Sequence, residues 1–194
     1  QSNKNVNSII ESLKPNGPVG LNIGGIMGGT NSLMLTHGGK NTSWGNNFNT
    51  QEVSFFNNQS WSQSKELVAS SIYDAISVCS GTNPGQYFVG TWNNGLLEFQ
   101  GDSLVNHYNT TNTSCELQSI IGTDGWVRVG GVDVDESNNV WLTNSQTNKP
   151  LVKFSNNSWT SFSVPNLSTN TMSGKIMCTS GGQKWIQLRD DGIL

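Results

Sequence analysis

A four-strand pattern recurs along this chain and limits the folds that it can adopt. The clearest copy holds four short apolar runs with turn residues between them: Val129–Val134, Val140–Thr143, Leu151–Phe154 and Trp159–Phe162. Short runs rich in β-branched and aromatic residues, separated by Asn, Gly and Ser, are typical of antiparallel strands joined by tight turns. This stretch therefore predicts one four-stranded meander.

Equivalent features occur earlier in the chain. Ile23–Ile26 carries the same central Gly-Gly pair as Val129–Val132, and Phe56–Trp61 keeps the spacing of Phe154–Trp159. The period of roughly 44 to 54 residues lies near that of a β-propeller blade. A β-sandwich or barrel could hold as many strands but does not predict this recurrence. We therefore expect propeller blades, with the Gly-Gly pairs near the axis, where blades crowd together.

The pattern predicts an all-β fold, a partial β-propeller of about three and a half blades built from four-stranded antiparallel meanders. Residues 1–194 form one domain in this interpretation, and residues 1–16 are a strand or tail of a preceding blade. An open stack leaves uncovered strand edges, which favour pairing with another chain. The chain is then part of a larger propeller, or two copies associate through their open edges. The predicted blades are 17–66, 67–122, 123–166 and the incomplete 167–194.

Charge and apolar content exclude several classes of function. The net charge is −3 and no basic stripe is present, so we expect no nucleic-acid partner. No apolar run approaches the ~20 residues of a membrane span, which leaves the chain peripheral to a membrane at most. The polar start at Gln1 indicates a removed signal peptide or an excised fragment. The three cysteines lack metal-site spacing, and Cys79 and Cys178 are expected in the core.

Two stretches resemble a known repeat. Asp135–Thr143 and Tyr87–Phe99 look like the two-component-regulator propeller repeat, which is common in the Bacteroidetes phylum. Lys14–Pro18, Leu33–Gly39 and Trp44 more specifically resemble the propeller of PorZ-like proteins, accessory components of the Por (type IX) secretion system. The resemblance implies a propeller in the periplasm or at the cell surface that binds a partner.

Aromatic residues beside amides are the best candidates for binding. Trp44 and Phe48 lie in a long polar insertion, and Trp92 precedes Asn93 and Asn94. Aromatic faces with neighbouring amides suit sugar rings, which offer apolar C–H faces and hydroxyl edges. The alternative is that these aromatic residues pack between blades, which we favour for Trp92 and leave open for Trp44.

Catalytic and metal-site signals are weak. The acidic run Asp133–Asn138 has alternate oxygen ligands, but it lacks the Gly and the bidentate Glu of a calcium loop, which favours a hairpin turn. His37 and His107 have no partners at a catalytic spacing and are expected to be ordinary strand or loop residues. We expect no metal and no cofactor.

These observations lead to one preferred function and two alternatives. The preferred function is a non-enzymatic envelope propeller that serves as a binding or scaffold module in type IX secretion or surface attachment. Its partner would be a protein or a cell-surface glycan. The first alternative is the periplasmic sensor ectodomain of a hybrid two-component system that binds an oligosaccharide. The second is an enzyme that acts on polysaccharide.

Overall fold

The described residues form four antiparallel sheets and one short helix. A computed structural model describes residues 16–29, 31–111 and 114–194. The predicted strand or tail over residues 1–16 lies almost wholly outside them. The first sheet contains β1 (Gly25–Gly29), β2 (Ser32–Thr36), β3 (Ser54–Asn57) and β4 (Ser60–Gln63). The second contains β5 (Ala75–Ser80), β6 (Gln86–Thr91), β7 (Leu96–Gln100) and β8 (Ser103–Tyr108).

The third and fourth sheets continue the same plan. The third contains β9 (Val129–Val134), β10 (Val140–Asn144), β11 (Leu151–Ser155) and β12 (Ser158–Phe162). The fourth contains β13 (Ser173–Cys178), β14 (Lys184–Leu188) and β15 (Gly192–Ile193). Each sheet is a simple meander that lies within one of the four ranges predicted for the blades. Helix α1 (Glu66–Ala69) follows the first sheet. No helix among the described residues is long and apolar enough to cross a membrane.

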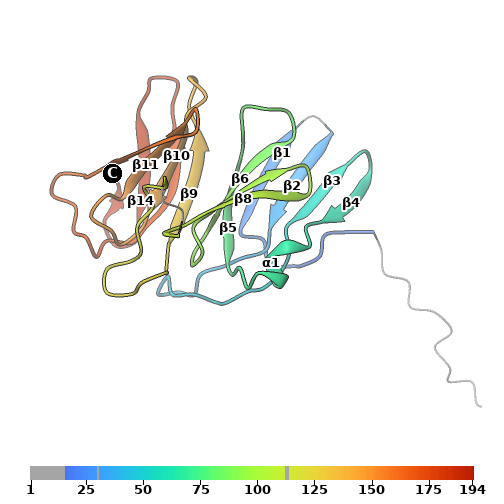
Figure 1. Cartoon of the computed structure of the whole chain (residues 1–194), viewed down its shortest axis with the longest axis horizontal. Helices are drawn as coiled ribbons and strands as arrows, with labels where there is room; N and C mark the ends of the chain where they lie inside the picture. Colours follow the sequence, from blue (N-terminus) through green and yellow to red (C-terminus); the bar gives the residue numbers. More distant parts are fainter. Residues whose placement is uncertain (1–15, 30, 112–113) are drawn as a thin grey trace, which may run out of the picture.

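The sheets stack side by side through their first strands. β1 contacts β5, β5 contacts β9, and β9 contacts β13, as expected for blades around an axis (Figure 1). The predicted all-β propeller architecture is therefore confirmed. The Gly-Gly pairs explain how close the first strands come. A Cβ atom on Gly131 would lie only 2.5 Å from the backbone nitrogen of Ile176. Larger residues there would force β9 and β13 apart.

Asparagine-rich turns set the outer hairpins. Asn156 and Asn157 between β11 and β12 both have positive φ, as do Asn58 and Gln59 between β3 and β4. Two consecutive positive φ values are typical of the tight turn that matches the twist of two-residue hairpins. These turns bring Phe154 opposite Trp159 and Phe56 opposite Trp61, which confirms that the shared Phe-to-Trp spacing has a structural cause.

Three apolar clusters fill the spaces between consecutive sheets. Met34, Val89 and Phe99 belong to the cluster between the first two sheets. Phe88, Leu142 and Val152 lie in the next cluster, and Ile176, Ile186 and Leu188 pack against Trp141 in the last. Cys79 lies in the core as expected, but Cys178 is only partly buried, so that half of the expectation was wrong. Cys178 is the last residue of β13 and does not belong to the cluster that holds Ile176.

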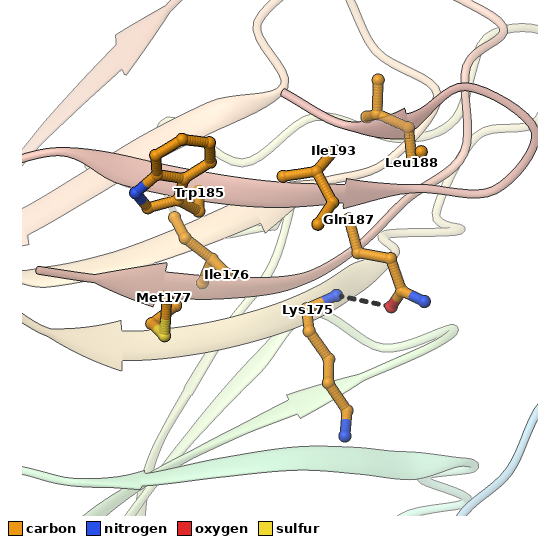
Figure 2. Close-up of a pocket in the computed structure, with 8 residues that line it drawn as sticks. Lys175, Ile176, Met177, Trp185, Gln187, Leu188 and Ile193 are labelled. Atoms are coloured by element: carbon orange, nitrogen blue, oxygen red, sulfur yellow. Dashed lines mark hydrogen bonds between the residues drawn. The ribbon is translucent and has the colours of Figure 1, made fainter.

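The fourth sheet leaves an apolar face uncovered. In each sheet, one residue of the first strand is paired with a residue of the second strand, and both side chains face the next sheet along the stack. In the fourth sheet this pair, Met177 and Trp185, is 57% and 46% exposed. Figure 2 shows both side chains with Ile193 at an open groove of about 570 Å³. The four equivalent pairs are Met27–Met34, Cys79–Phe88, Asp133–Trp141 and Met177–Trp185.

Candidate ligand-binding site

The polar insertion of the first sheet crosses the ends of the other three sheets. Its segment between β2 and β3 runs along one side of the stack (Figure 1). The Trp44 carbonyl accepts a hydrogen bond from Trp92 Nε1 at 2.7 Å, and Asn46 Oδ1 accepts one from Arg128 Nη2 at 2.9 Å. The Trp44 ring also packs against Gly174 of β13, where a Cβ atom would lie 2.8 Å from it. Trp44, Trp92, Arg128 and Gly174 come from four different sheets or their connections.

One buried carboxylate holds this insertion in place. Asp74 has no exposed surface. Its two oxygens accept hydrogen bonds from the backbone nitrogens of Asn47, Phe48 and Asn49, at 3.1, 2.9 and 3.0 Å. The side chain of Asn46 donates a fourth bond at 3.3 Å. Backbone donors that converge on an anion make a strong local anchor. The path of the insertion therefore depends on a residue that directly precedes the second sheet.

The anchored insertion holds two aromatic residues in an unfavourable backbone conformation. Trp44 and Phe48 have φ values of 57° and 55°. This left-handed region is uncommon for large side chains and costs free energy that the surroundings must supply. Backbone outliers of this kind cluster at binding and catalytic sites. The observed strain therefore marks the insertion as a candidate binding surface.

Phe48 is the centre of an accessible aromatic group that we call the Phe48 cluster, made of Phe48, Tyr73 and Trp126. Phe48 is 51% exposed, and its ring lies edge-on to Tyr73 and Trp126, with ring centroids 5.8 and 6.1 Å away. Tyr73 and Trp126 are partly buried, and they come from the connections before β5 and before β9. The three rings form a preassembled patch over three sheets.

The other expected site residues lie deeper. Trp92 has no exposed surface and Asn93 is 8% exposed, so the packing alternative describes Trp92. Asn94 is half-buried, and its Oδ1 accepts a hydrogen bond from the Tyr73 backbone at 2.9 Å. Of the five expected residues, Phe48 presents the most surface, while Trp92 and Asn94 support its neighbours. Asn93 supports the fold through its backbone carbonyl, which accepts from Val127.

A second feature of the insertion is a group of positive charges. The Lys40 ammonium lies 3.5 Å from the centre of the Trp44 ring and 4.5 Å from that of Trp92. Burial, with smaller contributions from the charges of Lys175 and Arg128, lowers the pKa of Lys40 to about 8. Arg128 also lies near the Trp92 ring, with its guanidinium carbon 5.1 Å from the ring centroid. Trp92 thus lies close to both cations, of which Arg128 is buried and Lys40 is partly buried, and helps to stabilise them.

The acidic loop after β9 is a turn. Asp135 Oδ1 accepts hydrogen bonds from the backbone nitrogens of Ser137 and Asn139, and its Oδ2 accepts from Trp141 Nε1 at 2.6 Å. Lys184 lies 3.5 Å from the same carboxylate. This confirms the hairpin interpretation of the loop. No group of three or more His, Cys, Asp or Glu residues that could hold a metal ion occurs within the described part of the chain.

Both histidines take part in structural contacts. His37 has no exposed surface, and its ring nitrogens lie 2.7 Å from Ser54 Oγ and 3.2 Å from the Asn22 carbonyl. Burial lowers its pKa. His107 Nε2 lies 2.6 Å from the Asn94 carbonyl. These contacts confirm that the histidines are ordinary strand and loop residues.

Sequence reasoning missed four residues of this surface: Asp74, Lys40, Tyr73 and Trp126. They lie in three different connections, with Tyr73 and Asp74 adjacent in one of them, and no local pattern distinguishes them from their neighbours. The one available signal was that Tyr73 and Asp74 directly precede a strand, where a side chain reaches the rim of the sheet.

Comparisons with known proteins support the fold. The chain matches no protein-family model and no curated protein. Its structure is similar to PorZ, an essential bacterial surface component of the type IX secretion system of Porphyromonas gingivalis. The TM-score is 0.77 at 23% identity, over 94% of this chain and 25% of the PorZ chain. It is also similar to virginiamycin B lyase from Staphylococcus aureus, with a TM-score of 0.58 at 11% identity, over 90% of this chain and 50% of the lyase.

Proposed function

We propose that this chain, which shares the propeller fold of PorZ, is a non-enzymatic binding and scaffold module of the cell envelope. Its place would be the periplasm or the cell surface, and its role type IX secretion or surface attachment. The similarity to PorZ over 94% of the chain and the resemblance of its repeats support this proposal. Because the chain spans only a quarter of PorZ, it would contribute one part of a larger function.

The Phe48 cluster is the observation that carries the proposal. A side chain as apolar as Phe48 stays 51% exposed although its loop is held by four hydrogen bonds to Asp74. A rigid exposed aromatic residue loses little conformational entropy on binding and is typical of recognition surfaces. The same rings can stack on the C–H face of a sugar or fill an apolar depression on a protein. The partner would accordingly be a cell-surface glycan or a protein.

Binding measurements with matched variants test this proposal. Phe48→Ala and Trp126→Ala should each weaken binding of a glycan or envelope-protein ligand by about 10-fold or more, as expected for aromatic anchor residues. Phe162→Ala is the control, because Phe162 is also exposed but lies on β12, outside the Phe48 cluster. Equal binding by all three variants and the wild type would overturn the assignment of this surface.

The envelope role needs a test in cells. If the chain serves secretion, proteins that are normally exported to the cell surface should accumulate in the periplasm when its gene is deleted in the source bacterium. A plasmid copy should restore export, and a copy with Phe48→Ala should restore it only in part. Normal export and attachment in the deletion strain would contradict the envelope role.

We also propose that the uncovered face of the fourth sheet associates with a second copy of the chain. The equivalent pair in the third sheet, Asp133 and Trp141, is covered by the fourth sheet, and Asp133 accepts a hydrogen bond from Cys178 at 2.7 Å. At the other end of the stack, Ile26 of β1 is 64% exposed on the side away from the second sheet. The fourth sheet of one copy can therefore pack against the first sheet of the next copy, as consecutive sheets do within the chain. Contact between two different surfaces favours head-to-tail association.

A further inference from the structure

A second pocket lies beside the insertion, near the ends of the innermost strands. It has a volume of about 320 Å³, and its walls include Lys40, Asn41, Trp44, Lys175 and Gln187. Several glycine backbones complete the walls, because the first strands come too close there for larger residues. Lys175 belongs to β13, and its side chain extends away from the sheet toward the inner strands (Figure 2). The pocket therefore receives lysines from both ends of the stack.

The charge in this pocket is unbalanced. Two lysines line it, and no Asp or Glu is among its lining residues. Within residues 16–29, 31–111 and 114–194, the ion pairs are Lys149–Glu116, Lys184–Asp135 and Arg189–Asp190, so neither Lys40 nor Lys175 has an ionic partner there. The nearby Asp74 carboxylate is already occupied by four hydrogen bonds. Lys175 is exposed, but Lys40 is partly buried, and a cation that is partly removed from water is unfavourable unless something supplies the missing charge.

Neighbouring groups add to the positive potential. Arg128, behind Trp92, donates to Asn46 and Gln146, and its Nε has no hydrogen-bond partner among the described residues. The pKa of Lys40 is lowered mainly by burial and then by the positive charges of Lys175 and Arg128. An anion placed between Lys40 and Lys175 would interact with both ammonium groups and relieve their mutual repulsion.

We infer that this pocket binds an anionic group, a carboxylate or sulfate, between the Lys40 and Lys175 ammonium groups. Asn41 and Gln187 supply amide groups at the rim, so the anionic group can be free or carried on a saccharide. This inference rests on the proposed binding function and assigns its ligand a charge. The Phe48 cluster and the lysine pocket share one anchored loop, but they use different side chains.

Isothermal titration calorimetry on the whole chain tests the inference with four probes: acetate, sulfate, glucuronate and glucose. We expect acetate, sulfate and glucuronate to bind and glucose not to bind. Glucuronate that binds at least 10-fold more tightly than acetate indicates a saccharide-borne anion, whereas equal affinities indicate a free anion, and both outcomes support the site. Binding of glucose as tight as that of glucuronate, or no binding of any anion, would overturn it.

Matched lysine variants locate the site. Lys175→Gln should weaken anion binding about 10-fold or more, because a hydrogen-bonded charge is lost. Lys175 is exposed, so this variant is expected to fold, and Lys40→Met keeps the apolar stem of a partly buried residue as a second probe. Lys65→Gln, at an exposed position outside the pocket, should bind as the wild type. Unchanged anion binding in both Lys175→Gln and Lys40→Met would refute the site. Phe48→Ala should leave anion binding intact, which separates this test from that of the Phe48 cluster.

Discussion

The Asp74 anchor allows a quantitative test of how the candidate surface is held. Replacing Asp74 with Ala removes the acceptor of three backbone N–H groups, from Asn47, Phe48 and Asn49, which all bond to a carboxylate with no exposed surface. An unsatisfied buried donor costs about 1–3 kcal/mol, so the three together predict a loss of roughly 3–9 kcal/mol. This loss is a large part of the ~5–15 kcal/mol that stabilises an ordinary domain.

Two structural details refine this magnitude. Asp74 has a φ of 51°, which Asn tolerates but Ala does not, so Asp74→Ala also carries a backbone cost of ~1 kcal/mol. Asp74→Asn keeps the shape and one acceptor oxygen but directs an amide donor toward another donor. We therefore expect Asp74→Asn to lose about 1–3 kcal/mol. Detachment of the loop would hydrate the three N–H groups, so it limits the loss in either variant.

Urea unfolding followed by tryptophan fluorescence measures the free energy, and hydrogen exchange at Asn47, Phe48 and Asn49 measures loop detachment. Exchange at these amides should accelerate in both variants, more in Asp74→Ala. Asp102→Ala, at an exposed turn, is the control and should change neither quantity. If Asp74→Ala stays within 1 kcal/mol of the wild type with unchanged exchange, the anchor does not hold the insertion and the reasoning fails.

Three further predictions follow from charge and exposure. The pKa of Lys40 is lowered from 10.5 to about 8, so between these pH values the unfolded chain binds the proton more strongly than the folded chain. The free energy of unfolding should therefore rise between pH 8 and 10.5, and it should rise more in the wild type than in Lys40→Met, as measured by urea unfolding. Burial alone would raise the pKa of Asp135, but hydrogen bonds from Asn139 and Trp141 and the charge of Lys184 hold it well below 3.8. Its stabilisation is therefore present above pH 3.8 and lost at lower pH, and Asp135→Asn should flatten this acid dependence in thermal melts. In sedimentation velocity the wild type should associate as its concentration rises, and Trp185→Asp should remain monomeric; a wild type that stays monomeric would contradict the proposed contact.

Local patterns determined most of the architecture. Alternation with period two defines a strand, and a pair of positive-φ asparagines defines a hairpin, so each meander could be predicted from adjacent residues. The Gly-Gly pair in β9 required only that neighbouring backbones approach closely, which Gly131 beside Ile176 confirms. Repetition then extended one meander to four. The buried position of Trp92 was also favoured in advance, because aromatic residues beside strand ends commonly pack between blades.

Only the tertiary structure decided which side chains meet at the candidate surface. Asp74 lies 25 to 28 residues from the donors that it binds, and Arg128 lies 82 residues from Asn46. Contacts over such separations depend on how the blades stack and on the path of an insertion that has no hydrophobic period of its own. That Lys40 and Lys175 lack an ionic partner among the described residues is equally invisible in the sequence, because only the fold decides whether a carboxylate lies beside a lysine. The exposure of Met177 and Trp185 has the same origin, since their counterparts in the third sheet are covered by the sheet that follows.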